Sequence, residues 1–455
     1  MPSPVYTLNT AGRSHSGPTG LVPQMLALFE AAGFAEMISP GDAVAIKLHC
    51  GEWNNTAYLR PVYARALADR VKALGGRPFV CDTVTQTYGQ ISPRATGLDL
   101  LITAERNGYS AATLGCPFLV ADGYNGTDDL RVDVPQGFLL KEAYIAKAIA
   151  LADVLIVLTH FKGHPIGVIG GSVKNLGIGA QSRRGKHNVH MGGHPTYGLG
   201  AATDFHPERC QGRACPKWEA CEACCPWGLF HVTETSIEWE REKCANCLSH
   251  LGATTACGVC DHPEVTVKAT CAAMADACLA TMETVGRDKV GFINMAIDIS
   301  PFCDCVGFAD MPLTPNVGIF AGRDPVALDK ATLDAVTAAP GMPGSAAFDY
   351  EAGESGAHKF SAASAVHYED ISEEIQLHTG ALNGLGSLEY ELVTVPPLAN
   401  ASLYSYPDAR RNREKYGPIF AKEDPFPGEL YDGKGYHRLD VVDLDRVSST
   451  NGQGE

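Results

Sequence analysis

The sequence lacks most of the signals that assign a chain quickly to a common class of protein. No apolar run approaches the roughly 20 residues of a membrane span, and the opening MPSPVYTLNT has neither the charged start nor the apolar stretch of a secretory signal. We therefore expect a cytoplasmic protein with no membrane span. A GxGxxG turn after a strand, a GxSxG elbow, a Walker loop and an HExxH helix are all missing. Their absence argues against a nicotinamide or flavin site, a serine hydrolase and a zinc protease.

Positive charge is also scarce. The chain has 36 Lys and Arg against 52 Asp and Glu, which gives a net charge of −16. A surface of that sign is not expected to bind nucleic acid or an anionic membrane. With 455 residues, 45% of them hydrophobic, the chain can bury a large core in two or three domains.

Cysteine, in contrast, is abundant and concentrated. Nine of the 16 cysteines lie between residues 210 and 260. Cytoplasmic thiols stay reduced, so such a group indicates a metal site rather than disulfides. The candidate ligands are Cys210, Cys215, Cys221, Cys224, Cys225, Cys244, Cys247, Cys257 and Cys260.

The spacing of these cysteines favours iron–sulfur over zinc. Cys215, Cys221 and the Cys225–Pro226 pair fall on three of the four places of the bacterial ferredoxin run C-x2-C-x2-C-x3-C-P, and Trp218 stands on the other. The pairs 244/247 and 257/260 are nine residues apart, which also suits a zinc ribbon. We expect one or two [4Fe-4S] clusters, with zinc as the alternative.

Strand and helix patterns alternate along the rest of the chain and predict an α/β fold with a parallel or mixed sheet and flanking helices. Apolar runs predict strands at 43–49, 154–160, 290–298 and 317–323, and periodic patterns predict helices from residue 60, at 141–153, at 265–286 and from residue 325. The helix at 265–286 is expected to be amphipathic, with Cys271 and Cys278 in the core. The predicted divisions are 1–206 and 264–386 for the two parts of the α/β domain, 207–263 for a ferredoxin-like insert and 387–455 for a peripheral extension.

The loop after strand 154–160 is rich in glycine and collects basic side chains, which are scarce in this chain. Loops that leave the carboxyl ends of parallel strands carry the ligand sites of such sheets, so we expect an anionic substrate or cofactor here. The segment 172–180 predicts a short helix whose first amides could hold an anion. A histidine-bound metal, from His187 with His190 or His160 with His164, is the alternative. The candidate catalytic residues are His160, Lys162, Lys174 and His187, and the candidate binding residues are Lys47, Asn175, Arg183, Arg184 and Lys186.

Cys303 and Cys305 stand two apart where strand 290–298 ends. Two such side chains with Asp304 between them cannot both be buried easily on one face. They are candidates for the catalytic set, either as ligands of a metal or in contact with the electron acceptor. A purely structural role is equally compatible with the pattern.

Several of these blocks together resemble the iron–sulfur family catalogued as domain of unknown function 362. They are VAIKLH, VLIVLTHFKGH, GGSVKNLGIG, RRGKHNVH, INMAIDISPFCDC and VGIFAGRDPVALDKATLD, in that order from about residue 43 to 340. The resemblance implies an α/β domain interrupted by a ferredoxin-like segment, and no settled reaction. The family's polar blocks fall on Lys47, His160, Lys162, Lys174, Asn175, His187, Cys303, Asp304, Cys305, Asp324 and Asp329. A fainter similarity to the amino-terminal domain of lactate racemases implies an organic-acid or cofactor site.

These observations predict an iron–sulfur redox protein. The first hypothesis is a ferredoxin-linked oxidoreductase that takes electrons from a ferredoxin or similar donor and acts on an anionic small molecule or cofactor. The alternative is a non-catalytic electron-transfer or metal-handling protein in which the cysteine insert is the working part. A hydrolase or transferase with a structural zinc site is the third possibility.

Overall fold

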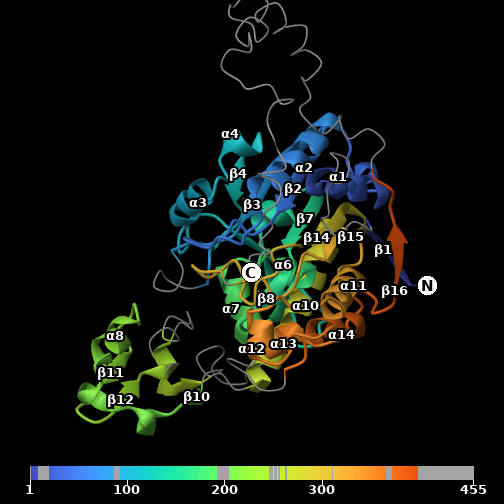
Figure 1. Ribbon diagram of the computed structural model, residues 1–455. Coiled ribbons are helices and arrows are strands. Elements are labelled where there is room, and N and C mark those ends of the chain that lie inside the picture. Colours follow the sequence, from blue (N-terminus) through green and yellow to red (C-terminus); the bar gives the residue numbers. More distant parts are fainter. Residues whose placement is uncertain are drawn as a thin grey trace, which may run out of the picture. The chain divides into compact units, whose positions relative to one another are not determined.

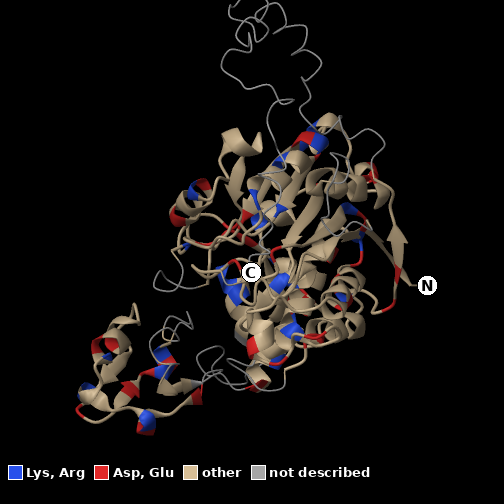
Figure 2. Ribbon diagram, viewed as in Figure 1, with Lys and Arg blue, Asp and Glu red and all other residues tan. Residues whose placement is uncertain are grey.

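The computed structural model describes residues 2–8, 20–86, 93–191, 204–244, 250, 254, 257–261, 264–309, 311–364 and 371–397. Its centre is an eight-stranded sheet in the order β16-β1-β15-β14-β7-β2-β3-β4, with helices on its two faces (Figure 1). This arrangement confirms the predicted α/β class. Acidic and basic residues are interspersed over the helices and loops that surround the sheet (Figure 2).

The middle of the sheet is parallel. Strands β2 (Ala43–Lys47), β3 (Arg77–Asp82), β4 (Phe118–Val120), β7 (Val154–His160) and β14 (Val290–Ala296) all run the same way. Every residue of β7 and of β14 is buried. A strand covered on both faces has no solvent side, which explains why both sequences are continuous apolar runs. Strands β2, β7 and β14 lie where the sequence predicts them.

One side of the sheet is mixed. Strand β15 (Gly318–Gly322) is antiparallel to β14, β1 (Ser3–Thr7) is antiparallel to β15, and β16 (Tyr390–Thr394) runs parallel to β1 at the edge. The segment predicted as a peripheral extension therefore contributes β16 to the main sheet. Its residues beyond 397 lie outside the described residues.

The order of the strands reverses between β2 and β7. From β2 the chain builds outward through β3 to β4, and it then returns to place β7 on the other side of β2, with β14 beyond it. Such a reversal leaves a crevice at the carboxyl ends of the two strands, where open α/β sheets bind their ligands. In this chain the reversal lies between Lys47 and His160.

Helices cover the sheet and one of them is central. They are α1 (Leu21–Ala31), α2 (Pro61–Ala73), α3 (Gly97–Arg106), α6 (Ser172–Gly177), α7 (Arg183–Met191), α10 (Glu264–Val285), α11 (Pro325–Ala338) and α14 (Ile375–Leu382). Helix α10 packs against α6, α7 and α14 and is buried on all sides from Thr270 to Met282, so the expectation of an amphipathic helix is wrong. Cys271 and Cys278 lie in the core, as predicted.

Helix α10 is also the one helix of the described residues that is long and apolar enough to cross a membrane. Of its most apolar window, 78% is buried inside the fold. Because its neighbours are other helices of the domain, its apolar character is explained by its place in the core.

The segment 141–153 differs from its prediction as a single helix. Residues Glu142–Ala146 form strand β6, and only Lys147–Ala150 are helical (α5). Strand β6 pairs in antiparallel fashion with β5 (Asp129–Asp133). Residues 142–146 are extended because they pair with β5. The local sequence KEAYIAKAIALAD contains no pattern that predicts this partner.

The cysteine-rich stretch forms small elements of its own. They are α8 (Trp218–Ala223), the pair β11 (Phe230–Val232) and β12 (Ile237–Trp239), and the pair β10 (Asp204–Phe205) and β13 (Cys260–Asp261). The last ladder joins Asp204 to Asp261 and so brings the two ends of the stretch together. A small core of apolar side chains and cysteine sulfurs holds it: Cys221, Cys224, Phe230, Val232, Ile237, Val259 and Cys260.

Candidate functional site

Buried charged side chains gather at the carboxyl ends of β2, β3 and β7. Lys47, the last residue of β2, is fully buried, and its Nζ lies 3.0 Å from Oδ1 of Asp82 at the end of β3. The same Nζ donates to the Leu48 carbonyl at 2.8 Å and to Oδ1 of Asn175 at 3.1 Å. All three protons of the ammonium group are therefore taken by the protein. Lys47, predicted to bind a ligand, is positioned to support the site instead.

Asn175, from α6, links strands β2 and β7 through hydrogen bonds. Its amide Nδ2 donates to the carbonyl of Leu158 at 3.2 Å and to the hydroxyl of Thr159 at 2.9 Å, both in β7, while its Oδ1 accepts from Lys47. Asn175, predicted as a binding residue, uses its polar atoms to hold β2 and β7 in register.

Asp304 is the acidic centre of the site. One of its oxygens lies 2.9 Å from Nδ1 of His160, and the other lies 3.5 Å from Nζ of Lys162. Burial opposes ionisation of this carboxyl group, but the nearby His160 and Lys162 outweigh burial and hold its pKa well below the usual range. Nε2 of His160 faces the carbonyl of Ile297 at 2.9 Å. Since both ring nitrogens are engaged by the protein, His160 fixes the loop after β14.

Lys174 differs from the other three lysines of the site. It is 9% exposed, and within the described residues it makes no hydrogen bond or ion pair, whereas Lys47 and Lys162 each face a carboxylate and Lys186 donates to oxygens. Burial, followed by the repulsion of Lys162, lowers its pKa well below 10.5. A buried ammonium group without an acceptor is costly unless a ligand supplies one.

His49, just beyond β2, is a site residue that the sequence does not single out. Its Nδ1 accepts the backbone N–H of Gly51 at 3.0 Å, so in the neutral ring the proton resides on Nε2. Burial first, and then the charges of Arg94, Lys162 and Lys174, lower its pKa well below 6.5. The imidazole is therefore a neutral N–H donor beside the two lysines.

Arg94 and Glu52 also belong to the site without any signal in the sequence. They form a buried ion pair of 2.9 Å between two loops, with side chains 4% and 1% exposed. The charge of Arg94 acts on Asp82, His49 and Lys174. Only the fold brings residues 42 positions apart into this contact.

The N-terminus of α6 is already occupied by an internal anion. The carboxylate of Asp329 accepts the amides of Ser172 at 2.8 Å and Val173 at 2.9 Å, and the side chain of Asn294 at 2.7 Å. Burial raises the pKa of Asp329 to about 6. The helix forms as predicted, but its amides hold Asp329 rather than a ligand.

The basic residues of α7 separate into two groups. Nζ of Lys186 donates to the hydroxyl of Thr83 at 2.7 Å, at the end of β3, and burial lowers its pKa to about 8. Arg183 donates to the carbonyl of Thr85 at 3.2 Å and so secures a loop. Arg184 makes a surface ion pair with Asp129 and lies over the ring of Tyr144.

His187 lies in the same helix, directly after Lys186. Burial lowers its pKa to about 4, with Arg183 and Lys186 adding repulsion. Of the four predicted residues in α7, the structure thus brings Lys186 to the carboxyl edge of the sheet, uses Arg183 to hold a loop and leaves Arg184 at the surface.

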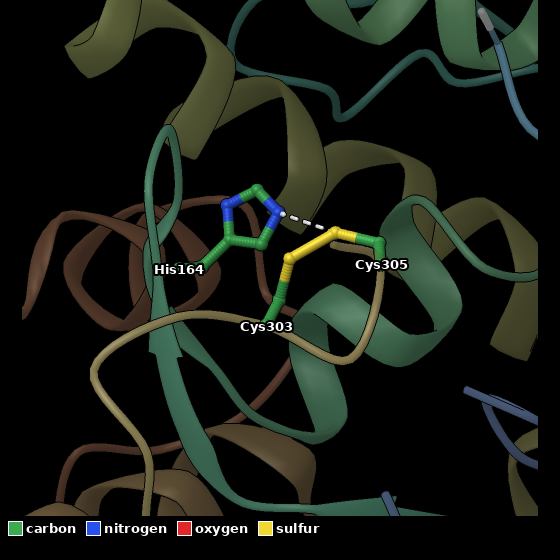
Figure 3. Close-up of side chains that lie close together, drawn as sticks. All are labelled: His164, Cys303 and Cys305. Atoms are coloured by element: carbon green, nitrogen blue, oxygen red, sulfur yellow. Dashed lines mark hydrogen bonds between the residues drawn. A yellow bond between two sulfur atoms is a disulfide. The ribbon is translucent and has the colours of Figure 1, made fainter. Parts of the chain in front are cut away.

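His164, Cys303 and Cys305 form a compact group (Figure 3). Their ligand atoms lie within 4.8 Å of one another, which is close enough to hold a metal ion. In the structure the two sulfurs are bonded to each other, and Nε2 of His164 lies 3.9 Å from the Cys305 sulfur. Burial first, then Lys174 and Lys162, lower the pKa of His164 well below 6.5.

Within the cysteine-rich stretch, thiols from three places in the sequence approach one another. Burial raises the pKa of Cys221, and the next influences on it are the thiols of Cys257, Cys215 and Cys210. The sulfur of Cys210 accepts the backbone N–H of Gly212 at 3.3 Å, the kind of hydrogen bond that tunes cluster sulfurs. Thiolates are soft donors of the kind that iron–sulfur clusters and zinc both take, so the residue types suit either group.

Three of the other predicted cysteine ligands belong to the same small core or border it: Cys224 and Cys260 are buried in the core, and Cys225 packs against it. Cys244 is half-buried. Cys247 lies outside the described residues.

Comparison with known proteins identifies the family. Residues 44–334, more than half of the chain, match the family described as Domain of unknown function (DUF362), and the protein belongs to that family. A search of curated protein sequences found no relative. Among solved structures, the lactate racemase apoprotein from Thermoanaerobacterium thermosaccharolyticum matches with 11% identity and a TM-score of 0.37, over 75% of this chain and 59% of that one. This chain thus spans less than two thirds of that protein. A match of this level says nothing about the ligand or the reaction of the present protein.

Proposed function

We propose that this protein is an iron–sulfur oxidoreductase that acts on a small anionic molecule. The observation that carries the proposal is the approach of Cys210, Cys215 and Cys257 to Cys221, because thiols from separate segments gather in this way around inorganic ligands. A four-iron cluster held there would supply single-electron transfer. A ferredoxin or a similar protein is the electron donor that such a cluster would use.

The anion would bind at the carboxyl edge of the sheet. Lys174 offers an ammonium group without a protein acceptor, Lys162 stands beside it, and His49 adds an N–H that meets no acceptor among the described residues. Charge-assisted hydrogen bonds from these groups suit a carboxylate or a phosphate. Lys47 and Asn175 hold the two strands in place behind them.

These residues also couple anion binding to proton uptake. The pKa of Lys174 is depressed because burial and the repulsion of Lys162 outweigh the attraction of Asp304. An anion within hydrogen-bonding distance would raise that pKa again. Binding should therefore be accompanied by uptake of a proton at pH values above the depressed pKa, and that proton would then stand next to the bound molecule.

The second candidate function is a metal-handling protein without a reaction of its own. It is favoured by the group of His164, Cys303 and Cys305, which could receive a metal ion beside the lysines. The two functions differ in what the cysteine-rich stretch holds and in whether a small anion binds between the lysines.

Anaerobic purification, iron and sulfide analysis and EPR of the reduced protein test the proposal. We expect equal amounts of iron and acid-labile sulfide, about four or eight per chain according to whether one or two clusters form. Cys221→Ser should lose a cluster, whereas Cys116→Ser, a buried cysteine of the α/β domain, should keep the full content. Zinc without iron in the purified protein would refute the proposal.

A further inference from the structure

The geometry around His164 points to a function of Cys303 and Cys305 that a metal site does not provide. Nδ1 of His164 accepts two backbone N–H groups, from Ile166 at 3.1 Å and from Gly167 at 2.7 Å. The ring of a neutral histidine carries one proton, which must therefore reside on Nε2. That nitrogen is the one that faces the sulfur of Cys305 at 3.9 Å (Figure 3).

This proton placement argues against metal coordination through His164. A histidine ligand binds metal through an unprotonated nitrogen and usually donates its other N–H to an oxygen. Here the nitrogen toward the cysteines is the protonated one, and the far nitrogen meets two donors. To bind a metal, the ring would have to lose its only proton or abandon both backbone amides.

We propose that Cys303 and Cys305 are a reversible dithiol–disulfide couple, with His164 as the positioning residue that donates a hydrogen bond to the Cys305 sulfur. Cys303 is 1% exposed and Cys305 is half-buried, so an incoming thiolate reaches Cys305 first. The loop that carries both is fixed: Asp304 is held by His160, and the N–H of Gly163 donates to the carbonyl of Ser300 at 2.9 Å. The two sulfurs therefore stay within bonding distance in both redox states.

The reaction exchanges two electrons with a dithiol. One thiolate of the reductant attacks the Cys305 sulfur, the bond between the two cysteines breaks, and Cys303 leaves as a thiolate that takes up a proton. The second thiolate of the reductant then attacks its own sulfur in the mixed disulfide and releases Cys305 as a thiolate. The reductant ends as a disulfide, and the protein gains two electrons. The step uses no iron, so it stands or fails separately from the proposed cluster.

The couple adds a capacity that a cluster alone does not have. Four-iron clusters pass electrons singly, whereas a disulfide takes up two. The charges of Lys162 and Lys174 act on His164, which faces the Cys305 sulfur. The Cys303–Cys305 couple therefore lies next to the proposed anion site. A molecule bound there would meet a two-electron donor.

Redox titration of the full-length, anaerobically purified protein tests this inference. The protein is equilibrated in mixtures of reduced and oxidised dithiothreitol, acid-quenched and alkylated, and the peptide containing residues 303–305 is measured by mass spectrometry. We expect that peptide to convert between no label and two labels as a two-electron couple, while the peptide carrying Cys271 keeps its thiol throughout.

Variants of His164 separate positioning from general stability. His164→Phe removes the donor and should favour the disulfide about tenfold in the exchange equilibrium, about 30 mV, because the reduced sulfur loses its hydrogen bond. His164→Gln, which keeps an N–H donor, should recover most of that change. A couple that does not convert in any mixture, or zinc or iron that is retained by the wild type and lost in Cys303→Ser, would overturn the inference.

Discussion

Replacement of Lys174 by methionine should stabilise the fold and abolish anion binding. Methionine keeps most of the aliphatic stem and removes an ammonium group that is 9% exposed and has no partner among the described residues. Relief of this burial should increase the free energy of unfolding by about 1–3 kcal/mol near neutral pH. Residues that bind ligands at a cost in stability commonly show this exchange of stability for function.

The pH dependence of that gain has a defined sign. The folded-state pKa of Lys174 lies well below 10.5, so between that pKa and 10.5 the unfolded chain holds a proton that the folded chain has lost. Wild-type stability therefore rises with pH in this window. The advantage of Lys174→Met should be largest below the folded-state pKa and should shrink as the pH approaches 10.5.

Lys162→Met is the matched control. Lys162 is equally buried, but it lies 3.5 Å from Asp304, so its removal leaves that carboxylate with less compensation and should lower stability by about 1–3 kcal/mol. Hydrogen exchange of peptides from β7 and β14 in increasing urea reports the stability of this region without assuming that the whole chain unfolds in one step.

Sulfate serves as the probe for the anion. Above its dissociation constant it should raise the stability of the wild type with the logarithm of its concentration. Lys174→Met should show only the smaller, general stabilisation that sulfate gives to any folded protein. A Lys174→Met protein that is less stable than the wild type and responds to sulfate as strongly would refute the reasoning about this lysine.

Three further substitutions test the buried charges. Lys47→Met should cost about 3–5 kcal/mol in urea denaturation, because it strands the buried carboxylate of Asp82. Asp329 has a pKa of about 6 in the fold against 3.8 normally, so wild-type stability should fall by about 3 kcal/mol as pH rises from 4 to 6, and Asp329→Asn should lose this slope. His187 has a pKa of about 4 in the fold against 6.5 normally, so its effect on stability has the opposite sign. Wild-type stability should fall by about 3 kcal/mol as pH falls from 6.5 to 4, and His187→Gln should lack this decrease. Matching pH profiles of variant and wild type would contradict either assignment.

The sequence predicts the strands and their exits well, for a simple reason. Strands β7 and β14 are buried on both faces, so their sequences are continuous apolar runs, and the first polar residues after such runs must stand at the carboxyl edge of a parallel sheet. His160 and the pair Cys303 and Cys305 are found at this edge in the structure because of that rule.

What the sequence does not predict depends on partners far away in the chain. The carboxylate at the start of α6 comes from Asp329, 157 residues later, and Arg94 meets Glu52 across 42 residues. The predicted helix at 141–153 becomes strand β6 because β5 pairs with it. The sequence of the basic loop also does not distinguish its exposed from its buried cations: Arg184 pairs with Asp129, whereas buried Lys174 meets no partner in the part of the chain that the structure describes.

The place of the cysteine-rich stretch in the chain explains how one fold can hold both proposed sites. The stretch begins after α7 and ends before α10, and these two helices are packed together through Val189 against Ala273, Met274 and Ala277. An insertion whose ends are joined in this way leaves the main core undisturbed. Helix α7 also carries Lys186, whose ammonium group binds Thr83 at the end of β3. Helix α7 thus both precedes the cysteine-rich stretch in the chain and contributes Lys186 to the carboxyl edge of the sheet.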